Sequence, residues 1–179
     1  MAKLVSPVLT YVARLAAGVV GTGRVVPADT LRSDALRGSS DAADYPLVNA
    51  DRTFVLRYQR GAPLGSPIGS PFGSDTQATI RADLIVSYRT DTAYPEIDTD
   101  AGADDTSPVR AMAADDMAVI LRALTWAENQ QASAGNGATV VSITPDGDHQ
   151  IDERGDVLLS VQPLAIVAQW SPITAWDMG

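Results

Sequence analysis

The sequence predicts an α+β fold: a four-stranded mixed or antiparallel sheet with two amphipathic helices on one face, in the order α-β-β-α-β-β. Two observations support this prediction. Apolar residues recur at helical spacing in two segments, and they alternate with polar residues in other segments that are typical of strands. The predicted strands follow each helix as a pair, which is typical of hairpins covered by helices. Residues 1–179 are therefore expected to form a single domain.

The first helix is expected to begin at Ser6-Pro7, because serine caps free amide groups and proline suits the first helical position. Apolar residues then recur at helical spacing as far as Val19, and Gly21 ends the helix. A short further helix is compatible with Asp29–Arg37.

The first two strands are expected at Arg52–Arg60 and Thr79–Arg89. The second of them is the longest alternating pattern in the chain, and only Ile85 interrupts its polar row. This pattern predicts the central strand of the sheet. Its apolar row consists of Ile80, Ala82, Leu84, Val86 and Tyr88, and its polar row of Arg81, Asp83, Ser87 and Arg89.

A long loop is predicted between these strands, over residues 61–77. It repeats Gly-Ser-Pro every four residues from Gly65, and proline at that spacing excludes a helix and a central strand. The loop far exceeds what a hairpin needs, so it is either a tolerated mobile insertion or an arm that binds a partner. Ile68 and Phe72 occupy matched positions in the repeat and favour the arm.

A second mobile loop is expected over residues 90–107, which are acidic and almost free of apolar residues. Its aspartates partly resemble a calcium-binding loop, but Val109 stands where such a loop needs a bidentate glutamate. A solvated acidic loop without a metal is therefore expected. The aspartates are Asp98, Asp100, Asp104 and Asp105.

The second helix is expected over Ser107–Gln131, followed by an exit loop at Ala132–Gly137. Ala138–Thr144 and Asp156–Trp170 read as strands of a second hairpin. Proline cannot donate to a strand ladder, so Pro163 predicts a bulge or a change of neighbour midway along the last strand.

Composition excludes several classes of function. The chain has 13 Lys and Arg against 22 Asp and Glu, and this negative charge disfavours binding to nucleic acid. It has no cysteine, which excludes disulfides, thiolate catalysis and cysteine-based metal sites. The apolar run at Leu4–Val20 is interrupted by polar residues and proline, so neither a signal peptide nor a membrane span is expected there.

A catalytic or cofactor site is not predicted. His149 is the single histidine and stands among carboxylates in the second hairpin, where a solvated turn is expected. Neither a nucleophile motif nor a phosphate-binding loop accompanies it. The protein is therefore expected not to be an enzyme and to hold no cofactor or metal.

The element order, chain length and acidic, cysteine-free composition resemble those of the tail terminator proteins of long-tailed bacteriophages. Four segments within residues 4–170 carry the resemblance: Arg52-Thr-Phe-Val-Leu, Ala82-Asp-Leu-Ile-Val-Ser-Tyr, Asp116-Met-Ala-Val-Ile-Leu-Arg-Ala-Leu and Leu164-Ala-Ile-Val-Ala-Gln-Trp. The insertion over residues 21–49 and the extended acidic loop depart from the smaller members of that family.

The resemblance implies a structural virion protein at the junction of tail and neck, assembled in the host cytoplasm. It implies a homo-oligomeric ring, expected to be a hexamer, that caps the tail tube and contacts both the tail tube protein and a neck or head-completion protein. Ile68, Phe72 and Trp176 are the expected partner-binding residues, and the four aspartates of the acidic loop are expected to line the ring. Neither membrane binding nor sequence-specific nucleic-acid binding is implied.

Two other classes of function remain open at this point. One is another phage neck or tail-completion protein of similar size. The other is a non-viral, ferredoxin-like binding module or small enzyme, whose activity would depend on residues such as His149, Asp146 and Asp152.

Overall fold

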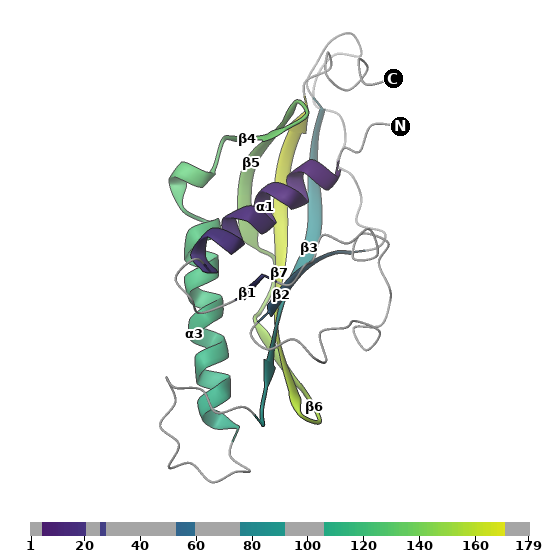
Figure 1. Ribbon diagram of the computed structural model, residues 1–179. Helices are drawn as coiled ribbons and strands as arrows, with labels where there is room; N and C mark the ends of the chain where they lie inside the picture. The colour runs from purple at the N-terminus through teal and green to yellow at the C-terminus, as the bar shows by residue number, and fades with distance from the viewer. Residues whose placement is uncertain (1–4, 21–25, 28–52, 60–75, 92–105, 171–179) are drawn as a thin grey trace.

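A curled half-barrel sheet dominates the fold of the protein (Figure 1). The computed structural model describes residues 5–20, 26–27, 53–59, 76–91 and 106–170. The elements are α1 Val5–Val20, β1 Val26–Pro27, β2 Thr53–Tyr58, β3 Thr76–Arg89, α3 Ser107–Leu124, the short 3-10 helix η3 Ala127–Asn129, β4 Ala132–Gly135, β5 Ala138–Pro145, β6 Gln150–Arg154 and β7 Val157–Trp170.

The expected four-stranded sheet in the order α-β-β-α-β-β is wrong. The described residues form a seven-stranded sheet in the order β1-β2-β3-β7-β5-β4, and β6 pairs with β7 beside that path. Six strands run antiparallel to their neighbours, and the two-residue β1 runs parallel to β2. The short strands β1, β4 and β6 were absent from the expectation because each has too few residues to display an alternating pattern.

The central pair consists of β3 and β7, each 14 residues long and paired along its whole length. At about 3.3 Å per residue, each strand spans roughly 46 Å. Ile80 faces Ile166 and Ala82 faces Leu164 on the side that contains the main core. The prediction of a central strand at Thr79–Arg89 is confirmed, and the strand begins slightly earlier, at Thr76.

The last strand changes its neighbour at Pro163, which is one of the two alternatives that its sequence predicted. β6 pairs with β7 as far as Val161, and β5 pairs with it from Leu164 onward. The carbonyl of Pro163 accepts a hydrogen bond from the backbone N–H of Asp146, at 2.9 Å, so its backbone faces the β5 side. Because proline has no N–H to offer there, the ladder is interrupted at the residue that cannot continue it.

The predicted exit loop at residues 132–137 is wrong, since it forms β4 and a tight hairpin with β5. The turn residues Asn136 and Gly137 have φ angles of 51° and 72°, and a type I′ turn requires positive φ at both positions. The Asn-Gly pair is the strongest short signal for such a hairpin. That signal was present in the sequence and was assigned to a loop.

Both helices pack on one face of the sheet and bury their apolar sides there. Val8, Leu9 and Val12 of α1, together with Ile120 and Leu124 of α3, have at most 1% of their surface exposed. This agrees with the amphipathic patterns of the two segments. The further helix considered at residues 29–37 lies outside the described residues.

The second helix is shorter than the predicted Ser107–Gln131, because its last carbonyls find side-chain partners after Leu124. The hydroxyl of Thr125 donates to the carbonyl of Leu121 at 2.8 Å, and the amide of Asn129 donates to that of Ala123 at 2.7 Å. The amide of Gln130 donates to the carbonyl of Leu124 at 2.8 Å. These bonds end the helix and direct the chain into η3 and β4.

Neither described helix is long and apolar enough to cross a membrane.

Candidate functional site

The residues expected to bind partners or to line a ring all lie outside the part of the chain that the structure describes. They are Ile68, Phe72, Trp176, Asp98, Asp100, Asp104 and Asp105. Polar side chains of the described residues meet in several places, and two of them bear on a candidate site. One is the sheet face opposite the helices, and the other is the connection between β5 and β6.

The sheet face opposite the helices has its own small apolar cluster. Val55 of β2, Ile85 of β3 and Leu159 of β7 are 2%, 3% and 5% exposed, and Val157 and Val161 pack against them. Ile85 is the residue that interrupts the polar row of the central strand. Its place in this cluster explains that interruption, because the second face of the sheet is apolar there rather than solvated.

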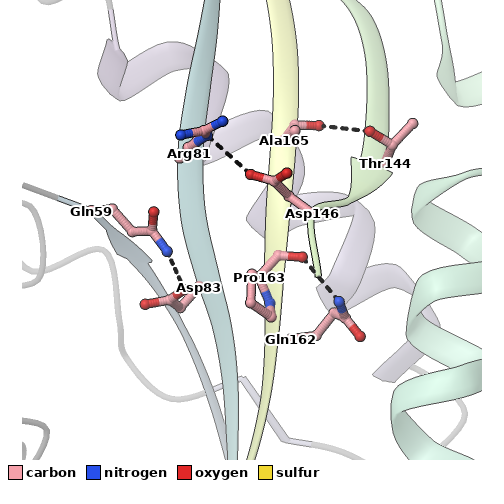
Figure 2. Close-up of polar contacts among 8 residues, drawn as sticks. All are labelled: Gln59, Arg81, Asp83, Thr144, Asp146, Gln162, Pro163 and Ala165. Atoms are coloured by element: carbon pink, nitrogen blue, oxygen red, sulfur yellow. Dashed lines mark hydrogen bonds and ion pairs between the residues drawn. The ribbon is translucent and has the colours of Figure 1, made fainter. Parts of the chain in front are cut away.

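A polar group lies next to this cluster on the same face, centred on the carboxylate of Asp83. Arg57 donates to one of its oxygens at 2.8 Å. Gln59 donates to the other at 2.7 Å, as Figure 2 shows. Arg57 is also the residue directly opposite Asp83 in the β2–β3 register. Asp83 is 6% exposed, and a carboxylate buried to that extent requires such partners to offset its lost hydration.

A second ion pair on this side of β3 ties the strand to the β5–β6 connection. The guanidinium of Arg81 lies 3.0 Å from the carboxylate of Asp146, and Figure 2 shows the pair reaching across β7. Both side chains are more than one-third exposed. We call Arg57, Gln59, Arg81, Asp83 and Asp146 the polar band, because together they cross β2, β3 and the connection beyond β7.

His149 belongs to a different group, on the helix side of the sheet. Its Nε2 lies 2.7 Å from the hydroxyl of Ser160, and burial lowers the pKa of the imidazole from its ordinary value. Residues 145–148 beside it are exposed, as a solvated turn requires, but the side chain of His149 itself is half-buried and anchored to β7, so the expectation is wrong for that side chain. The side-chain amide of Gln162 donates to the carbonyls of Gly147 and Pro163, at 2.9 and 3.0 Å, and holds the same connection.

This histidine–serine contact does not form a nucleophilic site that a substrate can reach. Ser160 is 0% exposed, and its hydroxyl lies within the sheet beneath the helices. A serine nucleophile must approach a substrate carbon while its base takes the proton, which requires access to the hydroxyl. The contact instead fixes the connection where β7 changes its neighbour.

Metal binding finds no support among the described residues. They contain no group of three or more histidine, aspartate or glutamate side chains that could hold a metal ion. Several of their carboxylates have arginine partners instead, such as Asp152 with Arg154 and Glu153 with Arg110.

The edges of the sheet are the remaining feature of this surface. β4 ends the strand path on one side and β1 on the other, and within the described ranges nothing pairs with the outer edge of β4 or β6. β6 carries Asp152, Glu153 and Arg154, and charged residues on an edge disfavour pairing with another chain. β4 reads Ala-Ser-Ala-Gly and has no such protection.

No protein-family model matches this chain, and no curated protein matches it in a sequence search.

Proposed function

We propose that this protein is a structural virion protein, the tail terminator of a long-tailed phage, which forms a ring that caps the tail tube and joins it to the neck. The observation that carries the proposal is the uncharged edge of the sheet at β4, which no strand of the described residues covers. An edge strand presents unpaired N–H and C=O groups with which another chain can pair. Identical subunits that cover it head to tail close into a ring when their rotation allows.

The charges of the described surface and of the whole chain give further support. The polar band supplies a surface of paired charges that is suited to a protein partner rather than to a reaction. The net charge of −9 keeps DNA from adhering to a ring through which it passes.

In this proposal, the mechanism is occlusion. The ring covers the last layer of tube subunits, so no further subunit can add, and it offers its other face to the neck. Ile68, Phe72 and Trp176 are the proposed contacts with these partners, and the aspartates of residues 98–105 line the ring. The ring is proposed to be a hexamer.

The test combines light scattering with negative-stain microscopy of the purified full chain, alone and with the tail tube protein encoded in the same genome. A ring and tubes of fixed length are expected. Ser133→Lys should prevent ring closure, because a charged side chain on an edge strand disfavours pairing with another chain.

Asp152→Lys, on the already charged edge of β6, is the matched control and should still allow a ring. A chain that stays monomeric at all concentrations, and forms no ring with the tube protein, would contradict the proposal.

A further inference from the structure

The outer side of α3 carries a stripe of exposed residues, two of them large and apolar, that do not pack against the rest of the described fold. Among the described residues, Val119 and Trp126 are the large hydrophobic side chains that remain exposed, at 38% and 49%. The stripe faces away from the core, since the buried side of α3 contains Met112, Met117, Ile120 and Leu124. We use the name outer stripe for Ala111, Asp115, Ala118, Val119, Arg122 and Trp126, all of which are exposed.

These residues lie along one side of the helix because their spacings of three, four and seven bring them to the same face. Trp126 follows the helix end, but Thr125 keeps helical backbone angles, with φ −89° and ψ 0°, so Trp126 still begins on this face. An exposed tryptophan on a helix face is a strong anchor for a protein partner.

The order of residues along the outer stripe identifies the partner. Asp115 and Arg122 lie at equal distances on either side of the midpoint between Ala118 and Val119. In two antiparallel copies of the helix that cross at this midpoint, each Asp115 therefore faces the Arg122 of the other copy. Neither side chain has an ion-pair partner among the described residues, so both charges are available.

Side-chain size is complementary about the same midpoint. Ala111 and Trp126 also lie at equal distances from it, so the large ring of one copy meets the small methyl group of the other. Ala118 and Val119 meet at the centre, where small side chains let two helices approach to about 8 to 10 Å. A single two-fold axis therefore makes both the charges and the side-chain sizes of the two copies complementary.

We propose that a second copy of this chain docks on the outer stripe through an antiparallel, two-fold contact between the two α3 helices. This contact is isologous and closes at two copies, whereas a ring requires a head-to-tail contact, so the proposal is independent of the proposed function. A single helix pair offers less than the roughly 1,600 Å² of a standard interface, so the dimer is expected to be weak.

Charge reversal tests the contact by sedimentation equilibrium on the full chain, at concentrations up to about 1 mM. Asp115→Arg places two like-charged pairs in the dimer and should weaken association by about tenfold or more, as should Arg122→Asp. An equimolar mixture of the two single variants should associate again, because both pairs become complementary between unlike chains. The double variant should also recover.

Asp148→Arg is the matched control, since it reverses an exposed aspartate away from α3 and should leave association unchanged. Melting curves check the fold of every variant. The proposal would be overturned if the mixture failed to associate, or if Asp148→Arg weakened association as much as Asp115→Arg does.

A cross-linking experiment tests the geometry separately. The chain has no cysteine, so Ala118→Cys introduces a single thiol at the centre of the contact and should form a disulfide-linked dimer on mild oxidation. Asp148→Cys should stay monomeric. Equal cross-linking of both variants, or of neither, would contradict the two-fold contact. The contact would also be contradicted if a quencher reached Trp126 in the chain alone and Trp126 became protected only after tail tube protein was added.

Discussion

At the scale of single residues, the carboxylate of Asp83 shows how the sheet face opposite the helices is stabilised. It is 6% exposed and held by Arg57 and Gln59, both from β2. A buried charge whose partner is removed keeps the cost of its lost hydration and loses the attraction that offset it. Removal of one partner is therefore expected to destabilise the fold by more than the intact pair stabilises it.

The first prediction concerns this pair. Arg57→Ala should lower the free energy of unfolding by about 2 kcal/mol, because Asp83 would keep only Gln59 as a partner. Urea unfolding measures the change. Arg154→Ala breaks the exposed pair with Asp152 and should cost less than about 0.5 kcal/mol. Equal costs for the two variants would show that the Asp83 pair behaves as an ordinary surface pair.

The second prediction concerns His149. Burial lowers the pKa of its imidazole below the ordinary 6.5, so the folded state favours the neutral ring. The unfolded chain then binds the proton more readily, and the stability that His149 contributes is present above pH 6.5 and is lost as pH falls through the lower, folded pKa.

The measurement is the melting temperature of the wild-type chain and His149→Gln, at about pH 7.5 and about pH 5.5. The variant should lose less stability between these two values, since glutamine can bond Ser160 without titrating. Identical pH dependence in both proteins would contradict the role given to the imidazole.

At the scale of elements, the β4–β5 hairpin depends on its turn. Gly137 has φ 72°, which a residue with a Cβ adopts at a cost of about 1 kcal/mol. As a third prediction, Gly137→Val should lower the free energy of unfolding by about 1 to 2 kcal/mol.

Hydrogen exchange should locate this loss in β4 and the start of β5. Asn136→Gly is the control and should be nearly neutral, because glycine tolerates the φ of 51° found there. A uniform increase of exchange across the sheet would argue against a local effect of the turn.

A fourth prediction concerns the Gly-Ser-Pro repeat. Its prolines exclude it from helix and central strand, so deletion of residues 65–74 should leave the unfolding transition of the sheet unchanged. Under the proposed function, the same deletion should abolish binding to the tail tube protein, measured by co-sedimentation. An unfolded deletion variant would contradict the interpretation of this segment as a binding arm.

At the scale of the whole molecule, the two faces of the central β3–β7 pair are packed differently. One face lies under both helices and contains the main core, and the other carries a smaller apolar cluster beside the polar band. Among the described strands, β4 is an edge without charged residues, while β6 is an edge that carries charges. The β4 edge and the outer stripe lie on different elements, so the two proposed contacts use separate surfaces.

The sequence by itself determined the elements whose patterns are long. The two helices, the β2–β3 pair, and β5 and β7 were predicted because burial on one side repeats at a fixed period over many residues. The change of neighbour at Pro163 was also predicted, as one of two alternatives, because a missing backbone donor is a local property of the residue.

Only the tertiary structure decided how many strands join the sheet and which polar residues meet. The short segments β1, β4 and β6 are strands because a neighbouring strand pairs with each of them. Their own residues have too little alternation between polar and apolar side chains to predict a strand. Likewise, Arg81 and Asp146, or His149 and Ser160, meet through pairings between distant segments. Such contacts depend on register and curvature, which are properties of the assembled sheet and not of any one segment.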